Sequence, residues 1–195
     1  MQMQALQQRI EAEGRNLGSG ILKIDSILNH QLDPQLMYEM GVEIGRRFQN
    51  VKVDRILTAE ISGIAPALMA AYALNVPVVY ARKIKPITMF GPVFLETAPS
   101  HTKNAEVNLL VSAEFMPPDQ DVLIIDDFLA TGKTLRALAR IIESARSRVA
   151  GVAVVVEKTF EGGREFMIEK GYNIPIEALV QITSMENGQI LFGED

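Results

Sequence analysis

The feature that most constrains this fold is a set of short, almost wholly apolar runs, each of which leads into polar residues. The clearest runs are 122–125 (VLII) and 151–156 (GVAVVV). A strand that is apolar on both sides needs both of its faces covered, which is typical of a parallel sheet between layers of helices. Residues 54–81 add a unit in the order strand, loop, helix, strand. We therefore predict an α/β fold with a mostly parallel, twisted sheet flanked by helices.

The segments around these runs fit the same architecture. Apolar residues at helical spacing predict a short helix within 2–13 and a longer one after Pro34, which suits a first helical turn. A third helix is predicted after Gly132, and the Asn187–Gly188 pair predicts a hairpin near the C-terminus. These elements supply the helical layers that the apolar strands require.

Three segments have less regular patterns. Residues 21–34 form a short apolar and polar stretch that ends in a turn, and residues 82–104 lose periodicity altogether. The second of these is predicted to be a long loop, and a loop of that length in a compact domain usually has a function. Residues 106–115 and 121–127 then predict two successive strands.

Composition excludes several classes of protein. The chain has 195 residues, of which 48% are hydrophobic, so we expect one compact domain spanning 1–195. It has no cysteine, no pattern of a secretory signal, and no apolar run near the roughly 20 residues that cross a bilayer. A cytoplasmic protein with no membrane partner is expected. The net charge of −5 argues against a nucleic-acid partner, because nonspecific binders carry a basic face.

The segment VLIIDDFLATGKT, residues 122–134, ends like the P-loop of an ATP-binding protein. A P-loop has a further glycine ahead of its Gly-Lys-Thr, at the position that Asp127 takes here. Asp126 and Asp127 together would repel a triphosphate. What remains is an apolar strand, two acids, a loop of small residues and a helix, which suits a ribose 5-phosphate: acids for the hydroxyls and amides for the phosphate.

The candidate phosphate loop can surround a phosphomonoester with backbone N–H groups and two threonine hydroxyls, while its glycine allows close approach. Its residues are Ala130, Thr131, Gly132, Lys133 and Thr134. Asp126 and Asp127 would accept hydrogen bonds from vicinal ribose hydroxyls or hold a hydrated magnesium ion. The alternative is an ordinary turn between a strand and a helix, with a solvated acid pair.

Two further loops fall at the same predicted edge of the sheet. The first could offer its amides to a second phosphate group and consists of Glu60, Ile61, Ser62 and Gly63. It carries no Lys or Arg, so a plain turn is its alternative. The second begins at Lys158, just past an apolar strand, and this lysine could donate to a carbonyl oxygen of a bound base. Its alternative is a solvated lysine.

These motifs resemble a known family. VLIIDDFLATGKT is similar to the signature of the type I phosphoribosyltransferases, and TAEISGIAPA to their pyrophosphate loop. The segment 82–104 resembles their flexible catalytic loop. LKIDSILNHQLDP near the N-terminus and VVVEKTF downstream resemble the branch of the family that acts on xanthine. The similarity runs from about Leu6 to Phe192.

The resemblance implies a reaction and a set of contacts. The 5-phosphoribosyl group would move from phosphoribosyl pyrophosphate to xanthine in purine salvage, with Mg²⁺ as the cofactor and a homodimer as the assembly. A small hood, made of about residues 1–35 and the C-terminal hairpin, would cover the site. The 5-phosphate would bind at 130–134, and the purine would contact Leu22, Asn29 and Lys158.

The leaving pyrophosphate must be neutralised, and its predicted loop has no cation. Arg82, Lys83 and Lys103 are the candidates, with the long loop closing over them as a lid. Each could instead be an ordinary solvated side chain. Asn29 could read the C2 carbonyl and the adjacent N–H of xanthine, or it could cap a turn.

Two other functions stay open at this point. One is a phosphoribosyltransferase for another purine, such as hypoxanthine, guanine or adenine, although a lysine donor suits a 6-oxopurine better than adenine. The other is a regulator that senses phosphoribosyl pyrophosphate without catalysis. The first 14 residues are too few for a helix-turn-helix, and the chain is acidic, so the enzyme is favoured.

Overall fold

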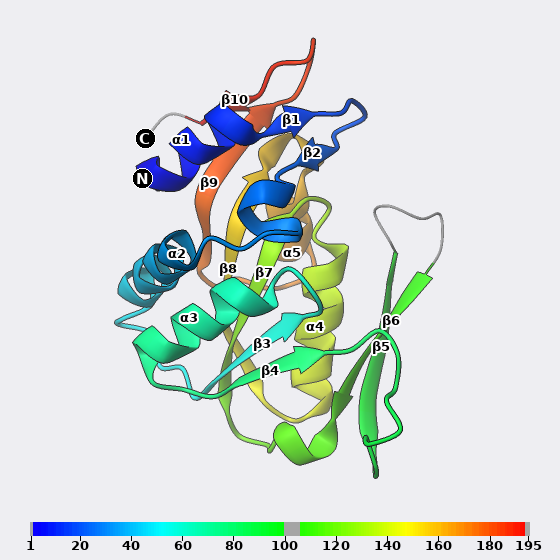
Figure 1. Cartoon of the computed structure of the whole chain (residues 1–195). Helices are drawn as coiled ribbons and strands as arrows, with labels where there is room; N and C mark the ends of the chain where they lie inside the picture. Colours follow the sequence, from blue (N-terminus) through cyan, green and yellow to red (C-terminus); the bar gives the residue numbers. More distant parts are fainter. Residues whose placement is uncertain (1, 100–105, 194–195) are drawn as a thin grey trace.

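A computed structural model describes residues 2–99 and 106–193 (Figure 1). The helices are α1 (Gln4–Glu13), α2 (Pro34–Arg47), α3 (Ile64–Leu74), α4 (Lys133–Ser144) and α5 (Gly163–Glu169), with short helical turns η1 (Asp25–Asn29), η2 (Ala113–Phe115) and η3 (Thr159–Glu161). The strands are β1 (Arg15–Asn16), β2 (Leu22–Lys23), β3 (Arg55–Ala59), β4 (Val78–Ala81), β5 (Val93–Pro99), β6 (Glu106–Ser112), β7 (Asp121–Leu129), β8 (Arg148–Lys158), β9 (Ile176–Ser184) and β10 (Leu191–Phe192).

The main sheet has the strand order β10-β9-β8-β7-β3-β4. All neighbours pair in parallel except β10, which pairs antiparallel with β9 and forms the predicted C-terminal hairpin. Strand β7 lies at the centre, between β3 and β8, and its carboxyl end carries Asp126 and Asp127. The α/β prediction with a mostly parallel sheet is confirmed.

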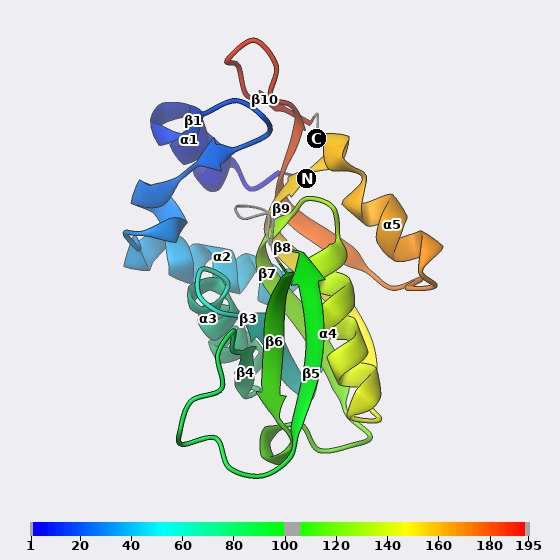
Figure 2. The ribbon, with the colours of Figure 1, turned by 90° about the vertical axis from the view of Figure 1, so that its right-hand side faces the viewer.

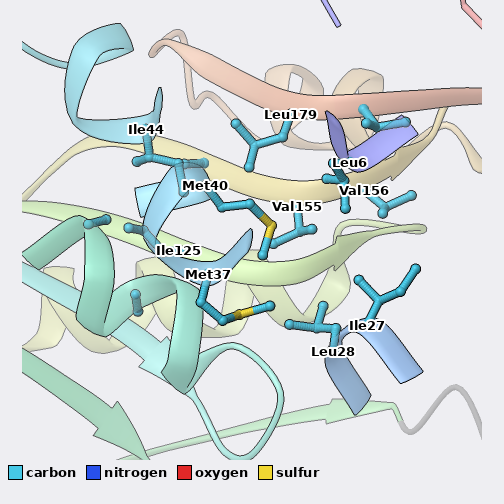
Figure 3. Close-up of a cluster of buried hydrophobic side chains, with 14 of the residues drawn as sticks. Leu6, Ile27, Leu28, Met37, Met40, Ile44, Ile125, Val155, Val156 and Leu179 are labelled. Carbon is cyan, nitrogen blue, oxygen red and sulfur yellow. The ribbon is translucent and has the colours of Figure 1, made fainter. Parts of the chain in front are cut away.

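The apolar strands are apolar throughout because both faces of the sheet are covered. Leu123 and Ile125 of β7 pack into one core, on the side of α1, α2 and α3, whereas Val122 and Ile124 pack into the other, against α4 and α5. This is the alternation that a strand imposes on successive side chains. Figure 3 shows the first core, in which side chains from η1 and from helices α1 and α2 meet strands β7, β8 and β9.

The N-terminal segments lie over the end of the sheet that carries the carboxyl ends of the parallel strands, next to the hairpin of β9 and β10 (Figure 1). We call residues 2–33 together with 185–193 the hood. The Asn16 side chain joins its two parts, because Nδ2 donates to the backbone oxygens of Met185, at 2.7 Å, and Gln189, at 3.0 Å. These hydrogen bonds therefore join the N-terminal and C-terminal parts of the hood to each other.

The prediction of one long loop over residues 82–104 is wrong in part. Residues 93–99 form β5, which pairs antiparallel with β6, and the two strands make an arm beside α4 (Figure 2). Pro92 and Pro99 at the ends of β5 hide its alternation in the sequence. Strand β6 was correctly predicted as a strand, but it belongs to this arm and not to the main sheet. Residues 100–104 of the predicted lid lie outside the described residues.

The segment 21–34 is more structured than its pattern indicates. It contains β2 and a single helical turn, η1, before Asp33 caps α2 by accepting from the backbone N–H groups of Gln35, at 3.0 Å, and Leu36, at 3.2 Å. Buried Ile27 and Leu28 anchor the turn in the first core (Figure 3). The anchored turn places Asn29 at the edge of the cavity described next.

Candidate functional site

A cavity of about 470 Å³ lies at the carboxyl ends of β3, β7 and β8, between the hood and the arm. Helix N-termini and strand ends meet at this edge in parallel α/β sheets, so it is where a ligand is expected. The sequence-predicted residues that line it are Leu22, Asn29, Glu60, Ile61, Ser62, Gly63, Lys83, Asp126, Asp127, Ala130, Gly132, Thr134 and Lys158. The structure therefore brings the three predicted loops and part of the hood into one cavity.

The predicted phosphate loop forms the start of α4. Gly132 has a φ of +75°, and a Cβ atom built on it would lie 2.7 Å from the backbone oxygen of Gly163, so both its conformation and its surroundings favour glycine. The hydroxyl of Thr131 is buried and has no hydrogen-bond partner among the described residues. An unpartnered buried hydroxyl costs free energy unless a ligand or water satisfies it. The side chain of Lys133 does not line the cavity; it lines a neighbouring groove.

The two acids differ in environment. Asp126 is 5% exposed, and its Oδ1 accepts from the backbone N–H of Asp127 at 3.0 Å. Burial, followed by the negative charge of Asp127, raises the pKa of Asp126 well above its usual range. Asp127 is half-buried, and its Oδ2 accepts from Asn29 Nδ2 at 3.2 Å. Asp127 is thus the acid that can meet a ligand more directly.

The acid pair also offers a test of the expected magnesium ion. Among residues 2–99 and 106–193, no group of three or more His, Cys, Asp or Glu side chains could hold a metal. Two carboxylates with room for water and phosphate oxygens are the hard donor set that Mg²⁺ accepts, since it usually keeps several waters. The residues present fit a hydrated magnesium ion shared with a phosphorylated substrate.

The loop 60–63 passes directly above Asp126. A Cβ atom on Gly63 would lie 3.0 Å from Asp126 Oδ1 and would collide with the hydroxyl of Thr58. The carboxylate of Glu60 accepts from the backbone N–H of Lys83 at 2.7 Å and lies 3.6 Å from Arg82 Nε. The peptide bond between Glu60 and Ile61 is cis. The loop is therefore held against the segment that carries the first two predicted cations.

The three predicted cations have different positions. Lys83 lines the cavity, whereas Arg82 lies beside Glu60 and is fixed through its backbone, which exchanges two hydrogen bonds of 2.8 Å with Leu110 of β6. Lys103 lies outside the described residues. Of the two cations in the described part of the chain, Lys83 thus lines the cavity.

The other end of the cavity lies under the hood. Lys158 Nζ donates to the backbone oxygen of Gly20 at 2.6 Å, lies 3.4 Å from Glu161 Oε1, and sits 5.2 Å from the centroid of the Phe128 ring. Leu22 supplies an apolar wall. Two of the donors of Lys158 are directed at these oxygens, which leaves one for a ligand.

Asn29 connects the two ends of the cavity. Its Nδ2 donates to Ser62 Oγ at 2.9 Å and to Asp127 Oδ2 at 3.2 Å. An amide nitrogen has two protons, so both donors are used by these acceptors and the side-chain oxygen remains as an acceptor. The family resemblance implies that Asn29 contacts the base, and its bonds to Ser62 and Asp127 depend on the way the hood folds over the sheet.

Among the cavity-lining residues that sequence reasoning missed are Ile21, Asp25 and Phe128. Phe128 was within the quoted motif, directly after the acid pair, and an aromatic residue at the end of a buried strand is a signal that could have found it. A half-buried aromatic ring suits the face of a planar base. Nothing in the local pattern distinguishes Ile21 and Asp25, which reach the cavity only because β2 and η1 fold above it.

Comparisons with known proteins agree with this geometry. The family model described as the phosphoribosyl transferase domain matches residues 25–180. The chain is 46% identical over 194 residues to a xanthine phosphoribosyltransferase of Lactobacillus johnsonii, covering 99% of this chain and 100% of the relative. It is 45% identical over 193 residues to the protein of that name from Listeria monocytogenes, again with 99% and 100% covered.

Solved structures show the same fold. Adenine phosphoribosyltransferase from Thermoanaerobacter pseudethanolicus has a TM-score of 0.73 and 25% identity, covering 90% of this chain and 99% of the other. The enzyme from Giardia lamblia, complexed with 9-deazaadenine, has a TM-score of 0.75 and 21% identity, covering 94% and 99%. The likeness to the second structure concerns the fold alone.

Proposed function

Since the chain belongs to the phosphoribosyltransferase family, we propose that it transfers the 5-phosphoribosyl group from phosphoribosyl pyrophosphate to xanthine, which gives xanthosine monophosphate and pyrophosphate. The observation that carries the proposal is the single cavity in which the phosphate loop and the acid pair face the Leu22, Asn29 and Lys158 end. Similarity over 99% of this chain, at 46% and 45% identity, to relatives named for xanthine supports the choice of base.

The positions of the residues suggest how the sugar is held. The 5-phosphate would bind the amides of 130–134 at the start of α4. It would also accept a hydrogen bond from the unpartnered hydroxyl of Thr131. The ribose hydroxyls would donate to Asp127, and the amides of 60–63 would receive the pyrophosphate, with Lys83 as its nearest described cation. The bond from C1 to the pyrophosphate oxygen breaks while the base nitrogen bonds to C1, and the proton that this nitrogen loses passes to the departing pyrophosphate. No protein nucleophile is needed. Charge neutralisation and exclusion of water are the tasks left to the protein.

Mg²⁺ is the cofactor that fits this arrangement. Asp126 and Asp127 would hold it through its waters, and pyrophosphate oxygens would complete its shell. When bound, the ion supplies positive charge beside the anionic leaving group. The raised pKa of Asp126 means that a cation near the pair would favour the ionised form of that carboxyl group.

The base end suggests how xanthine is distinguished. Lys158 can donate to the C6 oxygen, which xanthine shares with hypoxanthine and guanine, and the Phe128 ring lies close by. Asn29 would read the C2 edge. Its donors are engaged with Ser62, in the loop assigned here to the pyrophosphate, and with Asp127, assigned here to the ribose hydroxyls. Binding of the sugar would therefore release Asn29 donors for the C2 carbonyl.

One experiment tests the proposal directly. Xanthine, hypoxanthine, guanine, adenine and uracil are each supplied with phosphoribosyl pyrophosphate and Mg²⁺, and pyrophosphate release is followed. Xanthine should give the highest kcat/KM, and adenine should be among the poorest purines because its C6 amino group cannot accept from Lys158. A preference for another purine would replace xanthine as the substrate, and no release with any base would favour a sensor over an enzyme.

We also infer that the chain works as a cytoplasmic homodimer. No helix in the described ranges 2–99 and 106–193 is both long and apolar enough to cross a membrane. The loop after β4 exposes three large apolar side chains, Ile84 (77% exposed), Ile87 (91%) and Phe90 (81%), which suits burial against a second copy. Light scattering after gel filtration should give a dimer for the wild type and a monomer for Ile87→Asp with Phe90→Asp. A monomeric wild type would contradict the inference.

A further inference from the structure

A second hollow, of about 410 Å³, is lined by residues of β5 in the arm, of α4 and of α5, together with Lys170. We call it the basic groove. The side chains that matter to its chemistry are Lys133, Arg136, Arg140, Lys170, Glu96 and Phe166. Pro99 lines both the basic groove and the main cavity, so the arm forms a wall of each.

The charges in the basic groove are unbalanced. Glu96 is the one acid among the described residues that line it, and it binds Arg140 Nε at 3.0 Å. Lys170 Nζ lies 5.4 Å from the centroid of the Phe166 ring. The side chains of Lys133 and Arg136 have no hydrogen bond or ion pair to any described residue. Four cations thus meet one carboxylate, in a chain whose net charge is −5.

This arrangement works against the stability of α4. Lys133, Arg136 and Arg140 are three and four residues apart, so they repel one another along one face of the helix. Lys133 is also the first residue of α4, where the helix dipole disfavours a positive charge. A residue pattern that opposes local stability is expected where a ligand compensates for it. A bound anion would do so, because it would neutralise all three charges at once.

We propose that the basic groove binds a multivalent phosphate anion, either the phosphate chain of a nucleotide or inorganic polyphosphate. Arg136 and Arg140 would grip phosphate oxygens with their planar guanidinium groups, while Lys133 and Lys170 would act as point charges. The half-buried ring of Phe166 offers a nucleotide base an aromatic surface at the edge of the groove.

Occupation of the basic groove should affect the main cavity. Lys133 sits within the loop 130–134, in which Ala130, Gly132 and Thr134 line the main cavity while Lys133 lines the groove. An anion held by this side chain would change the positive charge felt by a 5-phosphate on the other side of the loop. The coupling rests on the proposed function, whereas the binding site does not. An added anion should therefore alter KM for phosphoribosyl pyrophosphate.

Isothermal titration calorimetry tests the site. Guanosine triphosphate and inorganic tripolyphosphate are titrated separately into the full chain, with ribose 5-phosphate in the main cavity and Mg²⁺ in excess over all phosphate. Binding to Arg136→Gln with Arg140→Gln should be weaker by on the order of tenfold or more, because two charge-assisted contacts are lost. Arg46→Gln on α2, an exposed arginine outside the groove, is the matched control and should bind as the wild type does.

The outcomes separate clearly. Tighter binding of the nucleotide than of tripolyphosphate would support the site and assign the nucleoside a contact, and equal binding would support a site for the phosphate chain alone. No binding to the wild type, or equal affinity in all three proteins, would overturn the proposal. The double variant should keep the wild-type rate with xanthine when no anion is added, since neither arginine lines the main cavity. If the basic groove binds no anion, the proposed transferase reaction is therefore not contradicted.

Discussion

The two ends of the main cavity are built in different ways. The phosphate end comes from one continuous segment, in which β7 leads through Asp126 and Asp127 into the loop 130–134 and α4. The base end combines Leu22 and Asn29 of the hood with Lys158, which follows more than a hundred residues later. A single turn between a strand and a helix fixes the first end. The second depends on the docking of the hood.

Because of this difference, substitutions at the two ends should have different effects on activity. Substitutions at the phosphate end should act on the reaction whatever the base, because every substrate presents the same sugar. Substitutions at the base end should act on the choice of base, and they can act from a distance by loosening the hood. Asn29 bridges the two ends through Ser62 and Asp127. A substitution there should therefore affect both the reaction with every base and the choice of base.

The largest effect is expected from the acid pair. Replacing Asp126 and Asp127 together by Asn removes both negative charges while keeping their shape, so kcat/KM should fall on the order of 10²- to 10³-fold. The loss should be similar for xanthine and hypoxanthine, because the proposed function assigns both acids to the sugar and its magnesium ion and neither to the base. Steady-state pyrophosphate release measures the rates, and circular dichroism checks the fold. Asp119→Asn, at an exposed turn, is the control and should keep the wild-type rate. A fully active double variant would show that the acids are not used.

A smaller and more selective effect is expected at Asn29. Asn29→Ala leaves the C2 edge of xanthine unpaired, which costs about 1–3 kcal/mol and should lower kcat/KM roughly 5- to 150-fold. Hypoxanthine lacks the C2 carbonyl and should lose much less, so the preference for xanthine should collapse. The comparison is kcat/KM for both bases in the variant, the wild type and Asn173→Ala, an exposed control.

Two results at Asn29 would count against a role in reading the base. An equal loss for both bases would mean that the residue only ties the hood to Ser62 and Asp127. Ser62→Ala helps to separate the roles, since it removes one of the two acceptors and leaves Asn29 in place. If the tie alone mattered, Ser62→Ala would reproduce part of the loss without any change in base preference.

A still smaller effect is expected from the attachment of the hood. Asn16→Ala removes two hydrogen bonds to the backbone oxygens of Met185 and Gln189, each worth about 1 kcal/mol. KM for xanthine should rise roughly fivefold if one of these bonds is replaced by water. KM for phosphoribosyl pyrophosphate should stay constant because the loop 130–134 is not touched. A parallel rise in both constants would contradict the separation of the two ends.

The same contrast explains what the sequence could predict. The parallel sheet and the acid pair followed from contiguous patterns, namely the apolar runs and VLIIDDFLATGKT. The arm did not, because Pro92 and Pro99 frame β5 and the pattern of β6 predicts a strand without indicating its partner. The roles of Leu22 and Asn29 needed the resemblance to a family, since no local pattern reports which residues meet across the hood. Phe128 was visible in the motif, but its position beside Lys158 required the folded chain.

The last and smallest prediction concerns stability at the phosphate end. The pKa of Asp126 in the folded chain is raised well above its ordinary value of 3.8, by burial first and then by the negative charge of Asp127. A raised pKa means that the folded state favours the protonated form, so this contribution to stability is fully present below the unfolded pKa. It is lost as the pH rises through the folded pKa.

Asp126→Asn cannot titrate, so it should gain stability relative to the wild type as the pH rises from about 4 to 8. For a chain of this size, each kcal/mol corresponds to roughly 2–4 °C in Tm. Thermal unfolding of both proteins at several pH values measures the difference in Tm. Asp127→Asn, which removes the neighbouring charge but keeps the buried carboxyl group, should reduce the pH dependence without abolishing it. A constant difference in Tm across the range would show that ionisation of Asp126 does not destabilise the folded chain. The phosphate end would then carry no electrostatic penalty that the base end lacks.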